Sequence, residues 1–535
     1  MSLIVEVNQG KLQGAENKSK LSGNTYYTFA GIPYAKPPIG ELRFKPPVPS
    51  EKWQGVYDAT HERDSCIQKD YFLSGQHVGA EDCLYLNIDT PEVPSEIKVP
   101  KAVMVFIHGG GFFTGSGSEK MYGGDFLMNH DVILVRINYR LHVLGFLNLG
   151  LEDCPGNAGL RDQALAIKWV KENIDKFGGD PNNITIFGES AGASSVHFQI
   201  LSPLTKGLFN KAIIQSGSGL TPWALTFNYK EMAFELGERL GFKGTCSEEL
   251  LQFLRAQPAK DLTKHVFDMT DDLKTRYPGR CTTIPFSPSI EEIKEGAFLP
   301  DLPQKLQESA EPLPLIYGVN NKEGFLLFAA LASNIAELIR DDFSLVLKYN
   351  FKIDPALLPE VSAKIKKYYF GDKEVGLDTA DTLVDLYSDI YFYLLYEPIE
   401  FVTKSSIPPY VYNFAYNGGH NFFKKVVFRT LKLECNGASH GDELGYLFLA
   451  RVLPNLPPLE GDDLTVIQNL TTLWTNFAKT GVPTDELTWT PSTSSQPRYL
   501  EIDRTLQLTE GKLYGERLQF LKDLLGPICK PFDIF

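Results

Sequence analysis

The chain has little of what membrane proteins and nucleic-acid-binding proteins need. Its 535 residues carry a formal net charge of −14, and a negative surface repels nucleic-acid phosphates, so we expect no nucleic-acid partner. Residues 1–7 hold neither a basic stretch nor a long apolar core, and no signal peptide or transmembrane segment is visible. A cytoplasmic location is therefore the default expectation, and secretion after removal of a leader is the alternative.

Two further absences concern cofactors and domains. The sequence contains no H-E-x-x-H motif and no clustered Cys/His ligand set, so we expect neither a metal nor an organic cofactor. It also contains no low-complexity linker, charge block or internal repeat. Length alone suggests about three or four domains. We expect instead one catalytic domain over residues 1–535, because the candidate catalytic residues are spread from position 190 to position 440.

The segment Gly188-Glu189-Ser190-Ala191-Gly192 is the most informative feature that is present. It follows the apolar run 184–187 and precedes a stretch with no proline until Pro203, which is the layout of a strand, a sharp turn and a helix. A serine on such a turn needs a positive φ, and the flanking glycines avoid a clash of a Cβ with neighbouring elements. Because G-x-S-x-G also arises by chance, an incidental turn is the alternative interpretation unless the chain also supplies an oxyanion hole, a base and an acid.

A glycine-rich segment suited to an oxyanion hole follows a second predicted strand. The apolar run 102–107 leads into His108-Gly109-Gly110-Gly111-Phe112. Consecutive glycines let backbone N–H groups point into a pocket, where they stabilise an anionic tetrahedral intermediate. A phosphate-binding loop is the rival interpretation, but no Lys-Ser or Lys-Thr pair closes this loop and its spacing matches no dinucleotide fingerprint.

His440 and Glu323 are the candidate base and acid. His440 is one of nine histidines and is flanked by glycines in the segment 437–441, and Glu323 comes just beyond the apolar run 313–319. Each residue taken alone is more often an ordinary surface residue of a loop. Their order along the chain favours a catalytic role: Ser190, then Glu323, then His440 is the order of α/β-hydrolases and differs from that of chymotrypsin and subtilisin.

With these segments the chain resembles a type B carboxylesterase, the family that also contains the cholinesterases, over nearly all of its length. The resemblance also rests on further motifs in family order: 29–35, Leu42-Arg43-Phe44, 81–87, Asn138-Tyr139-Arg140, 155–163 and Gln215-Ser216-Gly217. It implies an α/β-hydrolase fold, with a mostly parallel central sheet flanked by helices and with large helical insertions. We expect residues 334–402, which show helix-like spacing, to belong to these insertions.

The resemblance also implies roles for individual residues. It makes Ser190 the nucleophile and Glu323 and His440 its relay partners. Neutral His440 would take the serine proton as the hydroxyl attacks an ester carbonyl, and water would later release the acid from the acyl-enzyme. The resemblance further implies three oxyanion donors, two neighbours of the triad and two structural ion pairs: Gly110, Gly111 and Ala191; Glu189 and Ser216; Arg43 with Glu81 and Arg140 with Asp162.

The seven cysteines leave the redox environment open. By resemblance, Cys66 and Cys83 match the first disulfide of the secreted family members, and closing that short loop would contribute about 3 kcal/mol. Cys246 resembles one half of the second disulfide of the family. The next cysteine, Cys281, lies further along the chain than the family pattern has it, which puts that second bond in doubt.

The substrate pocket is marked only in part. By resemblance, Trp223 and Phe286 fall where the family lines its acyl pocket, and two aromatic rings there favour an apolar acyl group of limited bulk. Core packing is the alternative for both residues. Cholinesterases place a tryptophan ahead of the Glu-Asp-Cys segment to hold a quaternary ammonium group, and the corresponding residues 71–80 contain none. We therefore expect small-molecule esters that are uncharged and apolar as substrates.

The sequence thus predicts a serine carboxylesterase like the general carboxylesterases of animals, including the insect enzymes that handle xenobiotic or odorant esters. Hormone esterases commonly carry Gln before the nucleophile, where this chain has Glu189, so a hormone-type esterase is a weaker alternative. A scavenger that is acylated by toxic esters with little turnover would use the same triad and stays open. A non-catalytic adhesion protein is disfavoured, because all parts of the triad are present. The oligomeric state is left open.

Overall fold

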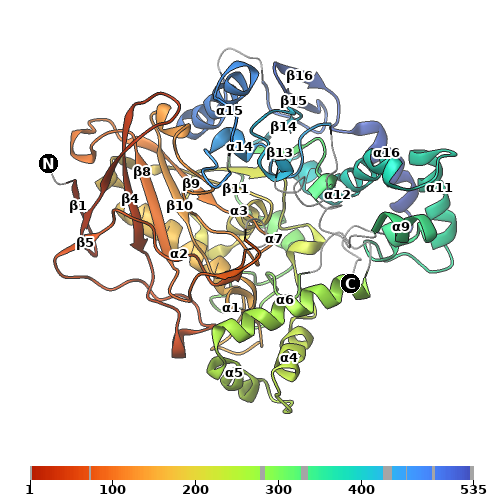
Figure 1. The fold of residues 1–535 in the computed structure, drawn as a ribbon, viewed down its shortest axis with the longest axis horizontal. Coiled ribbons are helices and arrows are strands. Elements are labelled where there is room, and N and C mark those ends of the chain that lie inside the picture. The colour runs from red at the N-terminus through yellow and green to blue at the C-terminus, as the bar shows by residue number, and fades with distance from the viewer. Residues whose placement is uncertain are drawn as a thin grey trace.

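The computed structural model describes residues 3–70, 74–277, 284–326, 335–425, 436–453, 455–484 and 489–529. Its centre is an 11-stranded sheet with the strand order β16-β15-β14-β13-β12-β11-β9-β10-β8-β4-β3 (Figure 1). The strands of this sheet are β3 (Ala15–Lys18), β4 (Thr25–Pro33), β8 (Tyr85–Thr90), β9 (Lys101–Ile107), β10 (Ile133–Ile137), β11 (Gly179–Glu189), β12 (Lys211–Gln215), β13 (Leu315–Asn320), β14 (Tyr410–Phe414), β15 (Arg498–Ile502) and β16 (Leu506–Glu510).

The direction of the strands follows the expected pattern. From β10 across the sheet to β15, every neighbouring pair runs parallel. The marginal strands β8, β4, β3 and β16 run antiparallel to their neighbours. Parallel strands need crossover connections that cover both faces of the sheet, and all seven residues of β9 are buried accordingly. The mostly parallel central sheet predicted from the sequence is confirmed.

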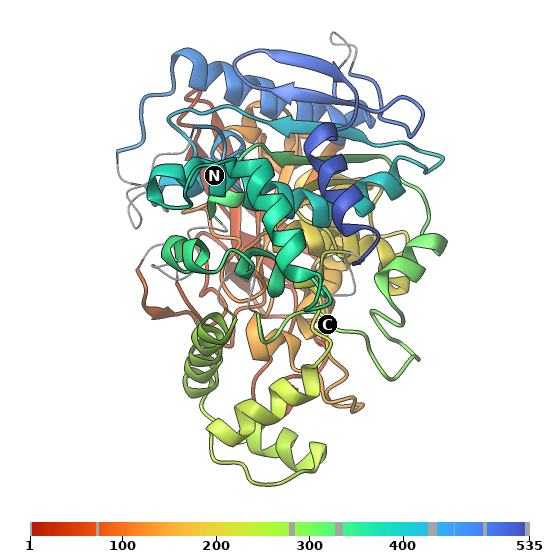
Figure 2. The same cartoon turned by 90° about the vertical axis from the view of Figure 1, so that its right-hand side faces the viewer.

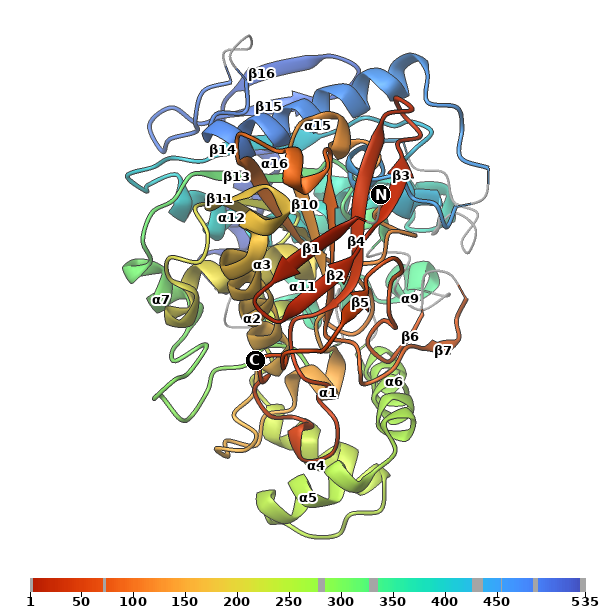
Figure 3. The same cartoon turned by 90° about the vertical axis from the view of Figure 1, so that its left-hand side faces the viewer.

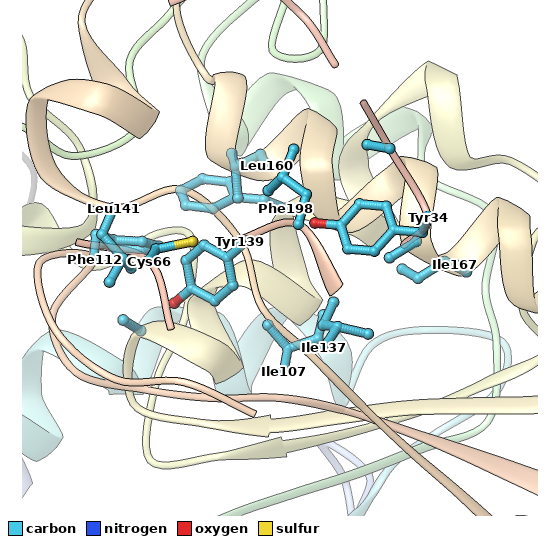
Figure 4. Close-up of a cluster of buried hydrophobic side chains, with 14 of the residues drawn as sticks. Tyr34, Cys66, Ile107, Phe112, Ile137, Tyr139, Leu141, Leu160, Ile167 and Phe198 are labelled. Atoms are coloured by element: carbon cyan, nitrogen blue, oxygen red, sulfur yellow. The ribbon is translucent and has the colours of Figure 1, made fainter. Parts of the chain in front are cut away.

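Strand β9 separates two hydrophobic cores. Val103, Val105 and Ile107 pack into one cluster, and the intervening Met104 and Phe106 pack into the other. Figure 4 shows part of the first cluster, around Ile107. Because successive side chains of a strand point to opposite faces, a slip of one residue would exchange the two sets. Each buried aliphatic or aromatic side chain contributes about 1.5–3 kcal/mol, so the two cores fix the register of the sheet.

Helices cover both faces of the sheet and form two further groups. The helices are α1 (His142–Phe146), α2 (Ala158–Asn173), α3 (Ala191–Leu201), α4 (Tyr229–Arg239), α5 (Ser247–Ala256), α6 (Ala259–Arg276), α7 (Pro303–Ser309), α9 (Ile335–Asp341), α10 (Leu345–Lys348), α11 (Leu358–Phe370), α12 (Ala380–Val402), α14 (Leu444–Leu447), α15 (Gly461–Thr480) and α16 (Gly515–Leu525). Helices α2 and α3 supply the first core and α15 the second. In Figures 2 and 3, α15 lies at the top of the molecule and α4, α5 and α6 lie at the bottom.

The expected helical insertion is present in the described part of residues 334–402. Helices α9, α10, α11 and α12 occupy it, and they pack with α16 into a third hydrophobic cluster. This group lies at the right of the sheet in Figure 1. Asn334, the first residue of the predicted insertion, lies outside the described residues.

The N-terminal part carries two small sheets and the expected Cys66–Cys83 disulfide. Strands β1 (Ile4–Val7), β2 (Gly10–Gln13) and β5 (Val56–Asp58) form one small sheet, and β6 (Gln68–Lys69) pairs with β7 (His77–Val78). Cys66 and Cys83 form a disulfide with a Cα–Cα distance of 4.9 Å. Cys246 is a free thiol, and Cys281 lies outside the described residues, as do Tyr71 and Phe72 of the segment 71–80.

Both predicted ion pairs are formed. Arg43 Nη2 lies 2.6 Å from Glu81 Oε2, and Arg140 Nη2 lies 2.7 Å from Asp162 Oδ1. The Arg140–Asp162 pair is buried, so the attraction between its two charges must offset the cost of removing both from water. Within the part of the chain that the structure describes, no helix is long and apolar enough to cross a membrane.

Candidate active site

Ser190 lies on a tight turn between β11 and α3. Its φ of 60° and ψ of −122° place it in a backbone conformation that residues other than glycine rarely adopt. A Cβ at Gly192 would lie 2.0 Å from the carbonyl oxygen of Ile107, and one at Gly188 would lie 2.6 Å from the same atom. Both flanking positions therefore need glycine because the backbones approach so closely. The strand, sharp turn and helix expected from the sequence are present.

The acid and the base are brought together by two neighbouring loops. Lys322 N donates a hydrogen bond to Ala438 O at 2.9 Å, which ties the loop after β13 to the loop that carries His440. His440 Nδ1 lies 2.5 Å from Glu323 Oε2, and both side chains are buried. These two residues are 117 positions apart in the sequence, so the sheet, and not local structure, makes their contact.

The carboxylate of Glu323 is held on its other side as well. Its Oε1 accepts hydrogen bonds from Ser216 Oγ at 2.5 Å and from Asn320 N at 2.7 Å. Ser216 itself has a φ of 57° and accepts a hydrogen bond at its carbonyl oxygen from Tyr391 Oη at 2.5 Å. Three contacts thus fix the position of the carboxylate that faces His440. Ser216, predicted as a neighbour of the triad, occupies that place.

The second ring nitrogen of His440 faces Glu189. His440 Nε2 lies 3.0 Å from Glu189 Oε1, within ion-pair distance but without the angles of a hydrogen bond. Ser190 Oγ makes no hydrogen bond to any of the described residues. Catalytic hydrogen bonds are often long without substrate and tighten in the complex. In this structure the imidazole therefore lies between two carboxylates, whereas the sequence placed Glu189 only in the surroundings of the triad.

Burial and charge act in opposite directions on this group. Burial lowers the pKa of His440, but the negative charges of Glu189 and Glu323 outweigh it, and the pKa of His440 is raised well above its usual value. Burial raises the pKa of Glu189, although His440 counteracts part of that rise. Both carboxylates thus stabilise the protonated form of the imidazole relative to its neutral form.

Glu443 is a third buried carboxyl group of the site, to which the sequence reasoning gave no role. Its Oε1 accepts a hydrogen bond from Gln215 Nε2 at 3.0 Å, and its Oε2 accepts one from Asn320 Nδ2 at 2.5 Å. Burial and repulsion by Glu189 raise the pKa of Glu443 to about 8. The signal available in the sequence was the position of Glu443, three residues after His440 in a segment flanked by apolar residues. Charged side chains are rarely buried, so its burial is the unusual feature.

The predicted oxyanion donors lie at or next to the turn that carries Ser190. Gly110 has a φ of 103° and Gly111 a φ of 61°, and the N–H of neither residue donates to an acceptor among the described residues. Ala191 is the first residue of α3, so its N–H has no partner within the helix. A Cβ added at Gly109 would lie 3.1 Å from Ser190 Cβ, which shows how closely the glycine loop approaches the serine.

The two aromatic residues predicted for the acyl pocket have different surroundings. Trp223 lies on the short 3-10 helix η6 (Pro222–Ala224), and its ring centroid lies 6.3 Å from that of Phe112, which directly follows the glycine loop. Its Nε1 is buried and has no hydrogen-bond partner among the described residues. Phe286 is only 1% exposed and packs inside the first hydrophobic cluster. The structure thus places Trp223 beside the oxyanion loop and Phe286 in the core. The pocket role of both residues stays a prediction.

Known proteins share this architecture. A model of the carboxylesterase family matches residues 1–521. Esterase FE4 of Myzus persicae is 36% identical over 533 residues, which cover 96% of this chain and 91% of that protein. The juvenile hormone esterase of Tribolium castaneum is 34% identical over 524 residues, which cover 93% of this chain and 87% of that protein.

A solved structure agrees with these relatives. The crystal structure of juvenile hormone esterase from Manduca sexta, with OTFP covalently attached, superimposes with a TM-score of 0.84 at 30% identity. The match covers 98% of this chain and 99% of that one, and it confirms the predicted α/β-hydrolase fold. The chain belongs to the carboxylesterase family and is a carboxylic ester hydrolase.

Proposed function

We propose that this enzyme hydrolyses esters through a covalent acyl intermediate on Ser190. The observation that carries the proposal is the contact of 2.5 Å between His440 Nδ1 and Glu323 Oε2, on a ring whose Nε2 lies 3.0 Å from Glu189, the residue before the serine. In each cycle His440 accepts the Ser190 proton as the hydroxyl oxygen attacks the ester carbonyl, and it then gives this proton to the departing alcohol. Water repeats the sequence and releases the carboxylic acid.

The charge that develops on the carbonyl oxygen needs donors. We assign the backbone N–H groups of Gly110, Gly111 and Ala191 to this task, each worth roughly 3 kcal/mol in the transition state. Glu323 holds the imidazole in the tautomer that can accept the serine proton and stabilises its protonated form. The covalent attachment in the Manduca sexta structure supports covalent chemistry in this family.

Replacement of Ser190 tests the mechanism. We expect Ser190→Ala to lower kcat/KM for an aryl ester by several orders of magnitude, because the triad acts as a unit and only the oxyanion donors and binding remain. Ser309→Ala changes an exposed serine and is the matched control. Folding of both variants is checked by circular dichroism. Full activity of folded Ser190→Ala protein would refute the assignment.

For the substrate class we propose uncharged, apolar esters, as in the turnover of xenobiotic, odorant or hormone esters. The described part of residues 71–80 offers no tryptophan to a quaternary ammonium group, an interaction worth about 2 kcal/mol or more when water is excluded. An apolar alcohol gains roughly 25 cal/mol per Å² on burial. Two of the relatives are named juvenile hormone esterases, and these names support an ester substrate. They also keep the hormone-type alternative open, although Glu189 stands where hormone esterases commonly have Gln.

Matched esters test this preference. We expect kcat/KM for naphthyl butyrate to exceed that for butyrylcholine by roughly one to two orders of magnitude, as the energies above convert. An equal or higher kcat/KM for the choline ester contradicts the proposed pocket. The same aryl ester separates turnover from sequestration, because a scavenger gives a burst of alcohol equal to the enzyme concentration followed by a much slower steady state.

We further propose that residues 1–535 act as one catalytic unit, with strands from both ends of the chain joined in one sheet as support. For the location, the cytoplasmic expectation competes with secretion. The Cys66–Cys83 disulfide supports the second, because such bonds persist in oxidising compartments.

A further inference from the structure

A cavity lies between the C-terminal end of α6 and the residues around the end of α10. Its volume is about 330 Å³, at the small end of the range of roughly 300–1,000 Å³ typical of small-molecule pockets. The residues that line it do not include the serine, acid or base of the candidate active site. Figure 1 shows α6 running from the lower helices toward the group of α9 and α11.

The charges that face this cavity are of one sign. Arg276 and Lys348 line it, and no Asp or Glu is among the described residues that line it. Neither cation has a carboxylate oxygen within 4.0 Å among the described residues. In a chain with a net charge of −14, two unpaired cations that share one concave surface favour an anionic ligand there.

Aromatic contacts hold the two sides of the cavity together. The ring of Tyr277, directly after α6, lies edge-on to the ring of Tyr349, directly after α10, with 5.4 Å between the centroids. Lys348 Nζ lies 5.2 Å from the centroid of the Tyr349 ring. Asn228 also faces the cavity and adds an amide that can donate a hydrogen bond. The cationic side is therefore part of an ordered wall.

The cavity also has an apolar wall. Leu225, Met232 and Phe351 line it, and all three side chains are buried. A ligand that satisfies both walls carries an anionic head and an apolar chain. A cation would be repelled by the first wall, and a small inorganic anion would leave the second wall without a partner.

The cavity is joined to the proposed acyl side of the active site through its walls. Leu225 follows Trp223 by two residues, and Pro285, another lining residue, directly precedes Phe286. The ring of Phe351 lies 5.7 Å from that of Tyr393 on α12, and the same helix carries Tyr391, whose ring lies 5.5 Å from His440. Residues that line the cavity are thus chain neighbours of Trp223 and Phe286, which are proposed for the end of the site that would hold the acid part of an ester.

We propose that this cavity binds carboxylates that carry an apolar chain. Hydrolysis of an uncharged ester with one water yields an alcohol and a carboxylic acid, and at neutral pH the acid gives its proton to solvent and becomes such a carboxylate. This identification of the ligand with the acid product rests on the proposed function. The binding of a carboxylate to the cavity does not.

Equilibrium binding of octanoate to the full chain tests the proposal. The double variant Arg276→Gln/Lys348→Gln removes both cations at exposed positions and keeps polar side chains there. The control Lys243→Gln/Lys352→Gln removes two other exposed lysines, which do not line the cavity. We expect calorimetry to give a Kd about tenfold or more weaker for the first variant and an unchanged Kd for the control, because charge-assisted hydrogen bonds to the carboxylate are lost. Octanol, which lacks the charge, should bind both variants alike.

The other outcomes overturn the proposal. No saturable binding of octanoate to the wild type, or the same Kd and stoichiometry in all three proteins, shows that the cavity is not its site. An equal loss in both double variants shows that only the overall charge of the surface matters. None of these titrations needs ester turnover. A failure of the carboxylate site is therefore distinct from a failure of the Ser190 mechanism, which the Ser190→Ala kinetics report.

Discussion

The floor of the candidate active site and its helical wall are held mainly by different forces, although Tyr391 Oη of the wall donates one hydrogen bond to Ser216 O of the floor. The floor lies where β11, β12 and β13 end, and short hydrogen bonds fix it, such as those from Ser216 Oγ and Asn320 N to Glu323. The wall comes from η6, α12 and the helices around them. Aromatic contacts hold it, with centroids 6.3 Å apart for Trp223 and Phe112 and 5.5 Å apart for Tyr391 and His440.

This difference separates chemistry from selectivity. A hydrogen bond weakens steeply when its angle or length changes, so the floor holds each reacting atom in one position. Apolar and aromatic packing depends on area and tolerates exchange of side chains of similar volume. We therefore expect changes in the floor to lower the rate for every ester, and changes in the wall to alter which ester is preferred.

The largest expected effect comes from Glu323→Gln in the floor. The amide keeps the shape of the side chain but loses the charge that stabilises a protonated His440, and its NH₂ group favours the wrong tautomer of the ring. We expect kcat/KM to fall by about three to four orders of magnitude for short and long acyl esters alike, as for loss of the equivalent charge in other triads. Steady-state kinetics with two aryl esters measure this.

The control for Glu323→Gln is Glu374→Gln, at an exposed position, which should leave kcat/KM unchanged. A loss confined to one acyl length in Glu323→Gln would contradict the assignment of Glu323 to the chemistry.

The floor is also the part that the sequence predicted best. The turn at Ser190 follows from a local pattern, because the glycines at 188 and 192 are required by backbone approach. The strands before it and before the glycine loop are continuous apolar runs, and both are present as β11 and β9. Glu323 and His440 could be paired only through the chain order of a known family, since their contact spans 117 residues.

The remaining features depend on burial in three dimensions. Nothing in the segment 188–192 shows that Glu189 reaches His440 Nε2. Likewise, nothing in the sequence around position 443 shows that Glu443 is buried deeply enough to raise its pKa to about 8. Family position alone predicted Trp223 and Phe286 as a pair, yet only Trp223 lies beside the oxyanion loop, while Phe286 packs in the core. The cationic cavity joins α6 to a segment about 70 residues away, at Tyr277 and Tyr349, a distance no local pattern encodes.

In the wall, Trp223→Ala should change preference more than rate. Loss of the indole leaves room beside the oxyanion loop, and each additional buried methylene of an acyl chain contributes about 0.8 kcal/mol. We expect the ratio of kcat/KM for an octanoyl ester to that for a butyryl ester to rise about tenfold, within the discrimination that apolar pockets achieve. The measurement uses matched naphthyl esters.

Trp53→Ala is the control for size, since Trp53 packs against Tyr57 in the N-terminal region, where its Nε1 donates to Lys11 O at 2.9 Å. A uniform loss in Trp223→Ala for both acyl lengths would mean that Trp223 belongs with the floor.

A smaller effect is expected at Glu189, where the floor sets the pH dependence. Burial lowers the pKa of His440, and the charges of Glu189 and Glu323 raise it further than burial lowers it. Only the unprotonated ring accepts the serine proton, so kcat/KM falls as the pH drops through this pKa. Glu189→Gln removes one of the two charges and lowers the pKa of His440, so we expect the acid limb of the kcat/KM profile to move to lower pH. Trp223→Ala should leave the limb in place, and a limb that stays fixed in Glu189→Gln would contradict the role of this carboxylate.

The smallest expected effect is on stability, at Glu443. Its pKa is about 8 in the folded chain against a usual value of 4.5. Between these two values the unfolded chain is ionised at this position and the folded chain is protonated, so the folded state binds more protons and loses stability as the pH rises. Glu443→Gln is neutral at every pH and lacks this contribution. We expect the Tm of Glu443→Gln minus the Tm of the wild type to increase by about 2–5 °C as the pH is raised from about 5 to about 8. Differential scanning fluorimetry measures it, with Glu374→Gln as the exposed control, and parallel Tm curves for Glu443→Gln and wild type would show that this carboxyl group is ionised in the folded enzyme.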